Sequence, residues 1–487
     1  MVTTEHYDVV VLGSGEAGKY LSWHMSATGK RTLMIERRYI GGSCPNIACL
    51  PSKNVIHSAK VASYAHRYAE FGVSAGTPST NMAAVLERKR EMVRVLWNIH
   101  LANFERNGTE IAIGEGRFVG ERTIEVSFPD GTVRRVQGDS VIVSTGSRTK
   151  LDGIPGLAEA QPLTHVEALE LDTVPAHLIV LGGGYISLEF AQAMRRFGSR
   201  VTVVERNRRI LHHEDTDVSD AIQELFSDEG IEVITGVHAH SVTGKSGDAV
   251  TLSFERDGKT VSLEGSHLLV ATGRTPNTSG IGLDLAGIET TCDGFIKVNE
   301  RLETTASRTW AVGDCAGSPF FTHIAFDDFR ILRDNYEGKA RVATGRQVPF
   351  CLFIDPELAR VGLTEAEARV QGTSYRLAKI PMTSVLRTHT LSETRGFLKA
   401  LLSTADDSIL GFTGFGPGVG ELLAPVQLAM ANNLPFTSLR DLIITHPTMT
   451  EGLGPLFNSK FQTVVQSPHA PAEHHQGPHQ LSTSRVH

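Results

Sequence analysis

The sequence predicts an α/β protein with two similar nucleotide-binding units and a separate C-terminal α+β domain. Residues 7–36 and 177–205 share one plan: an apolar strand, a glycine-rich turn, a helix and a second strand that ends on an acid. Continuous Val/Ile/Leu strands that alternate with helical patterns indicate βαβ units with buried parallel sheets. From Pro349 onward, mixed strands and helices replace this plan. The length of 487 residues agrees with about three domains.

The composition excludes several other classes of protein. The chain has 47 Lys and Arg against 54 Asp and Glu, a formal net charge of −7, and no basic stripe of the kind that binds nucleic acid. Five cysteines are too few for a disulfide scaffold. No apolar run approaches the ~18 residues of a membrane span, and the N-terminus lacks the basic start of a signal peptide. We therefore expect a cytoplasmic protein that binds neither nucleic acid nor membranes.

A glycine-rich turn follows the first predicted strand. Gly13, Gly15 and Gly18 lead into the helix, and Glu36 ends the second strand. Glycines allow the tight turn and let backbone N–H groups approach a pyrophosphate, while the acid accepts hydrogen bonds from ribose hydroxyls. A flexible loop is the alternative, but strand, helix and acid are all in register. We predict a Rossmann-like dinucleotide site.

The second unit repeats the pattern and bears on the choice of nicotinamide nucleotide. Gly182 and Gly184 open it, and Ser187 stands where a third small residue is needed. Glu205 ends its second strand, where a carboxylate binds a ribose 2′-hydroxyl and repels a 2′-phosphate. Three arginines that suit a phosphate follow directly: Arg206, Arg208 and Arg209. If these arginines form only a solvated basic turn, NADH is the nucleotide; we predict NADH, with NADPH as the alternative.

Two cysteines stand five residues apart just after the first unit, in the segment GGSCPNIACLPSK at 41–53. Without further ligands, Cys44 and Cys49 make a poor metal site, and no metal is predicted. Beside a nucleotide-binding unit the pair suits a reversible disulfide better than two unconnected buried thiols. The remaining cysteines have no motif partner and are predicted to be packed thiols: Cys292, Cys315 and Cys351.

A histidine and a carboxylate stand close together near the C-terminus, in THPTMTE at 445–451. Thiol–disulfide exchange needs a group that takes up and returns protons near neutral pH, and histidine does this. Glu451 lies five residues after His446 and can orient its imidazole. A surface histidine and a helix-start acid are the alternative when the segment is considered by itself.

Together these motifs resemble those of the class I pyridine nucleotide-disulfide oxidoreductases, the group of dihydrolipoamide dehydrogenase, glutathione reductase and mercuric reductase. The resemblance covers residues 6–463 and includes GGGYISLE, ATGRTPN and AVGDCAG. It implies an FAD-binding and central region at 1–150 and 275–347, an NAD(P)-binding domain at 151–274 and a dimerisation domain at 348–465. The polar, His-rich tail at 466–487 is expected to be disordered, without a metal site.

The resemblance also implies an electron path from the nicotinamide nucleotide through FAD to the Cys44–Cys49 disulfide and on to a small disulfide substrate. Cys49 would be the thiolate beside the flavin, and Cys44 the thiol that exchanges with the substrate. His446, oriented by Glu451, would be the acid/base for Cys44 and would come from the partner subunit of a homodimer. The peptide bond between His446 and Pro447 is implied to be cis.

Cofactor contacts follow from the same resemblance. Asp314 would bind the ribityl chain of the flavin, and Gly273 would lie beside the nicotinamide nucleotide. Lys53 would pair with Glu189 close to the flavin. Further cofactor-binding residues are implied: Gly42, Ser43, Gly116, Thr145, Gly146, Ser147, Tyr185, Ile186 and Val237.

Departures from the family pattern bear on the substrate. Pro45 and Ala48 replace an aliphatic residue and a glycine, so the turn between the cysteines is expected to differ. Ser52 and Lys53 follow the dihydrolipoamide dehydrogenase pattern, and the tail lacks the cysteine pair of mercuric reductases. We expect a lipoyl-type or other small disulfide. A flavin reductase for quinones, oxygen or metals that leaves the cysteines unused, and a non-catalytic flavoprotein subunit, are the rival hypotheses.

Overall fold

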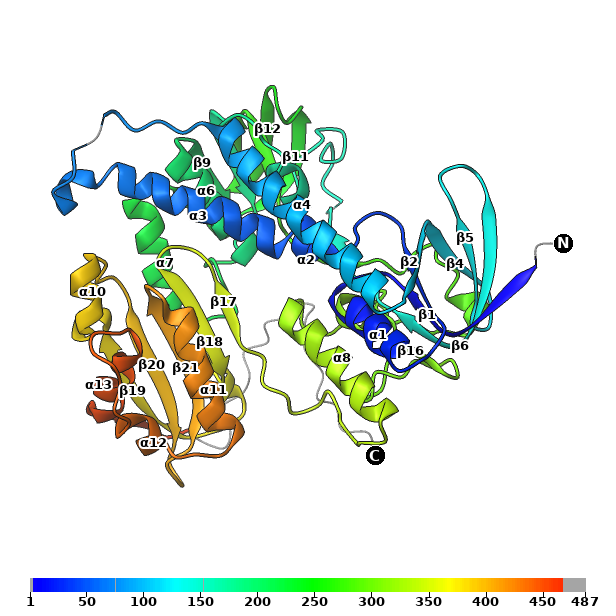
Figure 1. Ribbon diagram of the computed structural model, residues 1–487. Coiled ribbons are helices and arrows are strands. Elements are labelled where there is room, and N and C mark those ends of the chain that lie inside the picture. Colours follow the sequence, from blue (N-terminus) through cyan, green and yellow to red (C-terminus); the bar gives the residue numbers. More distant parts are fainter. Residues whose placement is uncertain (1–2, 75, 152, 467–487) are drawn as a thin grey trace. The chain divides into compact units, whose positions relative to one another are not determined.

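The computed structural model describes residues 3–74, 76–151 and 153–466. It divides into two compact units, Met1–Asp355 and Pro356–His487 (Figure 1). Among the described residues no helix is both long and apolar enough to cross a membrane. The tail predicted to be disordered lies, apart from Gln466, outside the described residues.

A seven-stranded sheet in the order β3-β2-β1-β6-β5-β4, with β16 also paired to β6, contains the first βαβ unit. Its strands are β1 (Thr4–Leu12), β2 (Thr32–Glu36), β3 (Glu110–Ile113), β4 (Glu115–Gly120), β5 (Thr123–Ser127), β6 (Val133–Val143) and β16 (Thr309–Ala311). β1 is apolar along its length because both of its faces are covered. Val9 and Val11 pack into a cluster with Leu21, whereas Val10 and Leu12 pack into a second cluster on the other face.

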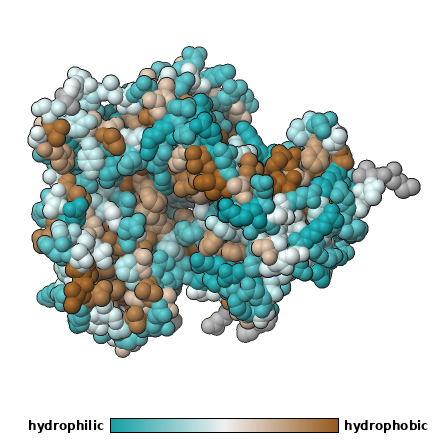
Figure 2. Space-filling view, viewed as in Figure 1, coloured by the Kyte–Doolittle hydropathy of each residue, from teal (hydrophilic) through white to brown (hydrophobic). Residues whose placement is uncertain are grey.

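Five helices accompany this sheet: α1 (Glu16–Ala27), α2 (Ser43–Asn46), α3 (Cys49–Ala65), α4 (Met82–Arg106) and α8 (Thr322–Tyr336). The side chain of Asn81 caps α4 by accepting a hydrogen bond from the Ala84 N–H at 3.1 Å. α4 exposes Val95, Ile99 and Leu101. The face of the molecule seen in Figure 2 is largely hydrophilic with scattered apolar patches.

The second βαβ unit carries a parallel sheet in the order β10-β9-β8-β14. Its elements are β8 (His177–Leu181), α6 (Tyr185–Phe197), β9 (Arg200–Val204), α7 (Thr216–Asp228), β10 (Glu232–Ile234) and β14 (His267–Val270). An antiparallel sheet of β11 (His238–Gly244), β12 (Val250–Arg256) and β13 (Lys259–Gly265) precedes β14. Other elements of the Met1–Asp355 unit are β7 (Ser147–Thr149), which pairs with β15 (Arg274–Pro276), α5 (His165–Ala168) and β17 (Phe350–Leu352).

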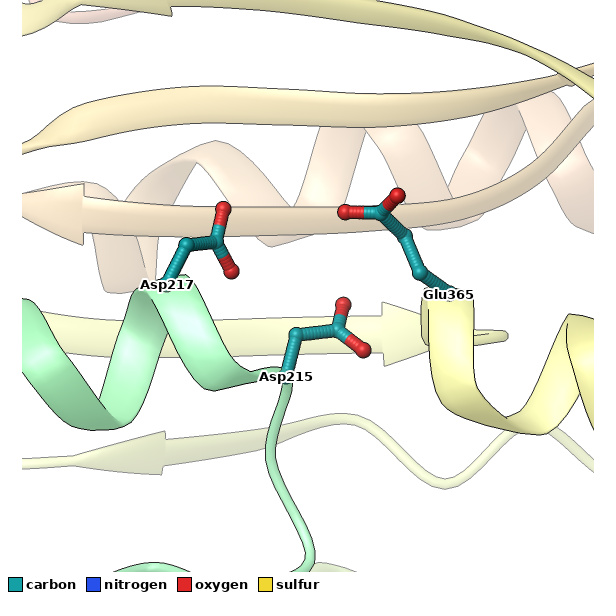
Figure 3. Close-up of side chains that lie close together, drawn as sticks. All are labelled: Asp215, Asp217 and Glu365. Atoms are coloured by element: carbon teal, nitrogen blue, oxygen red, sulfur yellow. The ribbon is translucent and has the colours of Figure 1, made fainter. Parts of the chain in front are cut away.

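Acidic side chains mark the starts of two helices. Asp215 immediately precedes α7 and Asp217 lies in its first turn, while Glu365 is the first residue of α9 (Glu365–Val370) in the other unit (Figure 3). Negative charge at a helix N-terminus is favoured by the partial positive charge of the free N–H groups. Each carboxylate therefore stabilises the start of its own helix.

The C-terminal unit, Pro356–His487, contains antiparallel strands in the order β18-β21-β20-β19-β22 and several short helices. These are β18 (Glu357–Gly362), β19 (Tyr375–Pro381), β20 (Phe397–Ser403), β21 (Ile409–Gly416), β22 (Gln462–Val464), α10 (Leu386–Leu391), α11 (Leu423–Ala431), α12 (Thr437–Arg440) and α13 (Leu453–Asn458). The two βαβ units and this α+β unit confirm the predicted fold class.

Candidate active site

Close backbone approach explains the glycines of the first turn. Gly13 has φ +101°, and a Cβ there would lie 2.3 Å from the carbonyl oxygen of Ser144. A Cβ on Gly18 would lie 2.3 Å from the Gly13 oxygen, and one on Gly42 would lie 2.5 Å from the Gly15 Cα. Larger residues would therefore push apart the turn, the β6 end and the segment that leads to the cysteines.

The start of α1 is left open toward the solvent or a ligand. Gly15 is its N-cap and no side chain caps it, so the first N–H groups have no side-chain acceptor there. The carboxylate of Glu36 holds the turn from behind: one oxygen accepts from the Ser14 N–H at 2.9 Å, and the other accepts from the N–H groups of Arg38 and Tyr39 at 2.8 and 3.0 Å. This geometry suits an anionic pyrophosphate.

A cavity of about 160 Å³ lies beside this turn. Its walls come from α1, the α2–α3 segment, α6, the β6 end, the turn after β16 and the start of α8. It brings together many of the predicted residues: Gly15, Ser43, Cys44, Cys49, Lys53, Gly146, Tyr185, Ile186, Glu189 and Asp314. Segments far apart in the sequence thus meet around one space.

The segment that carries the two cysteines is held by a short helix and by hydrogen bonds from the Asn46 side chain. Cys44 lies in α2, and Cys49 is the first residue of α3. The Asn46 amide donates to the carbonyl oxygens of Ile40 at 2.8 Å and Gly42 at 2.7 Å, which fixes the turn before the cysteines. Ala48 has φ −134°, so its position does not require glycine.

The environment of the cysteines polarises them in opposite directions. The two thiols are free in the structure. A hydrogen bond from Cys44, the hydroxyl of Thr322 at 3.2 Å and the charge of Lys53 lower the pKa of Cys49 to about 6. The same hydrogen bond, followed by burial, raises the pKa of Cys44. The favoured form is therefore a Cys49 thiolate with a protonated Cys44, at a helix start that further suits the negative charge.

Lys53 and Glu189 form the ion pair that the resemblance implied. The Lys53 ammonium lies 3.0 and 2.8 Å from the two carboxylate oxygens of Glu189. Glu189 is only 4% exposed, and one oxygen also accepts from the Phe353 N–H at 2.9 Å. This positive charge lies next to the thiolate site, on the cavity wall.

Asp314 is fixed by two residues of the β7–β15 ribbon. The Ser147 hydroxyl donates to its carboxylate, and the Arg274 guanidinium lies 3.7 Å from it. Arg274 also donates to the Ser147 hydroxyl and carbonyl oxygen at 2.7 and 3.0 Å. A carboxylate held this way on the cavity wall is an acceptor for ligand hydroxyls.

The turn of the second βαβ unit is organised around Glu205. Gly182 has φ +111°, and a Cβ on Gly183 would lie 2.9 Å from the Glu205 carboxylate. This buried carboxylate accepts from the N–H groups of Gly183 and Asn207. Gly184 caps α6 without a side-chain cap, which leaves a second open helix start.

The three arginines after Glu205 differ in their contacts. Arg209 is exposed and pairs with Asp220 at 3.0 Å. Arg206 and Arg208 are exposed and form no ion pair with any residue that the structure describes. Two guanidinium groups therefore stand near the buried carboxylate without a carboxylate partner among the described residues.

The other predicted contact residues lie around these two turns. Val237 follows β10, and its N–H donates to the Glu205 carbonyl oxygen at 3.3 Å. Gly273 has φ +151°, and Thr145 lies between the cavity-lining Ser144 and Gly146. Gly116 lies in β4, where a Cβ would meet Leu12 at 2.5 Å, so it packs in the core and does not line the cavity.

His446 and Glu451 belong to the second unit. The imidazole Nδ1 lies 3.0 Å from one Glu451 oxygen, and the His446 side chain is 63% exposed. The Thr448 N–H donates to the other oxygen at 2.8 Å, and this bond together with His446 lowers the pKa of Glu451. The His446–Pro447 peptide bond is cis, as the resemblance implied.

Sequence reasoning missed two groups that hold the cysteines and the ion pair. Thr322 is in no motif, and it reaches Cys49 across 273 residues of sequence. The Phe353 group that binds Glu189 is a backbone N–H, which nearly any residue would supply. The signal for Thr322 was only its place at the start of a helix soon after the AVGDCAG motif.

Comparisons with known proteins agree with this geometry. The family model of the pyridine nucleotide-disulphide oxidoreductases matches residues 7–328, and that of their dimerisation domain matches residues 348–456. The probable pyridine nucleotide-disulfide oxidoreductase RclA of Escherichia coli is 33% identical over 93% of this chain and 99% of its own. The dihydrolipoyl dehydrogenase of Mycobacterium leprae is 32% identical over 93% and 98%.

A mercuric reductase of Staphylococcus aureus is 31% identical over 92% of this chain and 81% of its own. Among solved structures, the HOCl-induced flavoprotein disulfide reductase RclA and its Cu(II) complex both match with TM-scores of 0.85 at 32% identity, over 93% of this chain and 99% of theirs. The fold, the two glycine turns and these matches lead to one assignment: the chain belongs to the pyridine nucleotide-disulphide oxidoreductase family, the flavoprotein disulfide reductases, and carries their dimerisation domain.

Proposed function

We propose that this protein is a cytoplasmic FAD-dependent enzyme that transfers electrons from NADH to a small disulfide, of the dihydrolipoamide dehydrogenase type, through Cys44 and Cys49. The observation that carries the proposal is the oppositely polarised thiol pair on the wall of the cavity. We assign FAD binding to 1–150 and 275–347, NAD(P) binding to 151–274 and dimerisation to 348–465.

The residues around the cavity fit FAD. The uncapped start of α1 suits its pyrophosphate, and the fixed Asp314 carboxylate suits hydroxyls of its ribityl chain. Lys53 would lie near the isoalloxazine ring. When bound, FAD supplies the step between a two-electron hydride donor and a dithiol.

The chain's own residues then carry the exchange chemistry. Two electrons and one proton, together the content of the NADH hydride, convert the Cys44–Cys49 disulfide into a thiolate at Cys49, stabilised by Thr322 and Lys53, and a thiol at Cys44. Cys44 loses its proton to His446 of the partner subunit and attacks one substrate sulfur. The other substrate sulfur leaves as a thiol, taking the proton. Cys49 then attacks Cys44, which restores the disulfide and releases the second substrate sulfur as a thiolate that takes a proton from solvent.

The nucleotide preference is expected to depend on Glu205. Its buried carboxylate would bind the ribose 2′-hydroxyl of NADH and repel the 2′-phosphate of NADPH, so NADH should reduce the holoenzyme about tenfold faster or more. Anaerobic stopped-flow with each nucleotide measures this and also tests the function. A long-wavelength thiolate–flavin band should appear; its absence during flavin bleaching would contradict the use of the cysteines.

In the variant Glu205→Gln the preference should shrink, since a neutral amide does not repel the phosphate and Arg206 and Arg208 remain. The matched control Glu232→Gln removes a carboxylate from the neighbouring strand β10, where it is exposed. If NADPH reduces the unmodified enzyme faster than NADH does, attraction of the 2′-phosphate by the arginines outweighs repulsion by Glu205, and the NADH proposal is wrong.

Removal of the Thr322 hydroxyl is expected to raise the pKa of Cys49. That pKa is lowered to about 6, so the thiolate is present above this pH and is lost as the pH falls through it. Thr322→Val removes one hydrogen bond to a charged sulfur and should raise the midpoint by about one unit. The measurement is a pH titration of the long-wavelength absorbance of the reduced holoenzyme. Thr305→Val, at a residue that does not line the cavity, is the control, and an unchanged midpoint in Thr322→Val would exclude the role.

Reduction of Cu(II) is a second candidate function, since a matching solved structure is a Cu(II) complex of RclA. Here the Cys49 thiolate and the Cys44 thiol would together give one electron to each of two Cu(II) ions, forming two Cu(I), one disulfide and one proton. Formation of a Cu(I)–chelator complex under NADH turnover tests it. Loss of that activity in Cys44→Ser would support the dithiol route, and its survival would favour direct transfer without the cysteines.

A further inference from the structure

A carboxylate lies on the cavity wall close to the proposed exchange thiol. Glu16 is the first residue of α1, and its side chain is 15% exposed and lines the cavity together with Cys44. After the Cys49 hydrogen bond and burial, its negative charge further raises the pKa of Cys44. Burial and then the same charge raise the pKa of Tyr20, one helical turn along. The field of Glu16 is thus felt on the Cys44 side of the helix.

A buried chain of groups holds this carboxylate in place. The Lys19 ammonium lies 2.7 Å from Glu16 and 3.0 Å from the His100 Nε2, and its side chain is only 5% exposed. An ammonium can only donate, so Nε2 accepts and Nδ1–H donates to the Leu96 oxygen at 2.6 Å. Burial lowers the pKa of His100, which agrees with a neutral ring.

A ligand in the cavity meets the negative charge of Glu16 and not the positive charge of Lys19. The Lys19 ammonium is buried between His100 and the helix, whereas Glu16 lines the cavity. The ring of His100 also packs under the backbone that leads to Cys44, since a Cβ on Gly41 would lie 2.8 Å from it. Glu16 is therefore fixed relative to the exchange thiol and not a mobile surface acid.

We propose that Glu16 is a specificity-determining residue that discriminates against anionic molecules at Cys44, so that the substrates are neutral or cationic small disulfides. This inference rests on the proposed function, in which Cys44 is the thiol that exchanges with the disulfide substrate. The repulsion itself needs only a reactive Cys44 with the carboxylate nearby. At separations of several ångströms in a partly solvated site, one unit charge changes a rate by about threefold to tenfold.

Alkylation of Cys44 tests the repulsion without turnover. The NADH-reduced holoenzyme is treated anaerobically with iodoacetamide or with iodoacetate, two reagents of similar size that differ in charge. In both, the Cys44 sulfur displaces iodide and loses its proton. Each rate is divided by the rate for free 2-mercaptoethanol. We expect the enzyme to favour the neutral reagent about threefold to tenfold, and Glu16→Gln to reduce that ratio to near one.

Variants separate charge from structure. In Glu16→Gln the side-chain amide oxygen can still accept the Lys19 hydrogen bond. The ratio and not the overall rate is the readout, because a changed Cys44 pKa affects both reagents alike. Glu16→Asp keeps the charge and should keep the ratio. Glu121→Gln removes an exposed carboxylate outside the cavity and should also keep it. The same ratio in the unmodified enzyme and Glu16→Gln would overturn the proposal.

Turnover with lipoamide and lipoate, which differ by one carboxylate, then tests the substrate class. The unmodified enzyme should have a higher kcat/KM for lipoamide than for lipoate. Glu16→Gln should narrow this difference by raising kcat/KM for lipoate. Equal narrowing in Glu121→Gln would contradict the assignment. Turnover of neither compound, nor of other small disulfides, would overturn the proposed function, whereas the alkylation ratio would still decide the role of Glu16.

Discussion

Serine in place of Cys44 is expected to abolish disulfide reduction, by on the order of 10⁴-fold or more, because it removes the only sulfur proposed to attack the substrate. NADH should still reduce the flavin of this variant, since the nucleotide turn around Glu205 is untouched. Cys49, Thr322 and Lys53 also remain in place, so a thiolate at Cys49 should form without a disulfide partner. Steady-state assays with lipoamide, together with anaerobic absorbance spectra, measure both effects.

Two comparisons make the Cys44→Ser result decisive. Cys292→Ser changes an exposed cysteine outside the cavity and should leave turnover unchanged. Quinone reduction, which requires no thiol exchange, should largely persist in Cys44→Ser. Disulfide turnover that survives the loss of Cys44 would show that the proposed mechanism is wrong and would favour the flavin reductase alternative.

Glutamine in place of His446 should slow disulfide turnover by about 10²–10³-fold, since a general acid/base contributes an effect of this size. Glu451→Gln should have a smaller effect, because it removes the orienting carboxylate but keeps the imidazole. His389→Gln changes another exposed histidine of the same unit, one that contacts a backbone oxygen, and serves as the control.

Mixed dimers test whether the histidine comes from the partner subunit. A dimer of one Cys44→Ser chain and one His446→Gln chain contains one complete site if the site is shared, and none if each chain completes its own. Recovery of disulfide turnover on mixing and refolding the two inactive variants is therefore expected. No recovery in verified mixed dimers would contradict the shared site.

Local sequence patterns were enough to predict the fold class, and they also singled out Cys44 and Cys49, which the structure places on the wall of one cavity. The two glycine turns need close backbone approach at Gly13 and Gly182, and only a residue without a Cβ permits it, so the requirement is written into the sequence. Continuous apolar strands such as β1 likewise reflect coverage on both faces.

Contacts made by common residues across long stretches of chain could not be predicted this way. Thr322 stabilises Cys49 through a hydroxyl that many surface threonines also carry. The Glu16–Lys19–His100 chain combines a helix-start acid, a lysine and a histidine 81 residues away, each of which is ordinary in isolation. Their significance comes from burial and from the cavity, which only the folded chain defines.

The pairing of β16 with β6 has a consequence for biosynthesis. Thr309 of β16 pairs with Val141 of β6, so the last strand of the first sheet is encoded after the entire second βαβ unit. At the usual ~5–20 residues per second of translation, the first sheet waits on the order of 10–30 s for its final strand. During this time the second βαβ unit, whose strands all lie between residues 177 and 270, can fold on the ribosome. The first sheet would then close only after the second βαβ unit, although its first strand leaves the ribosome earlier.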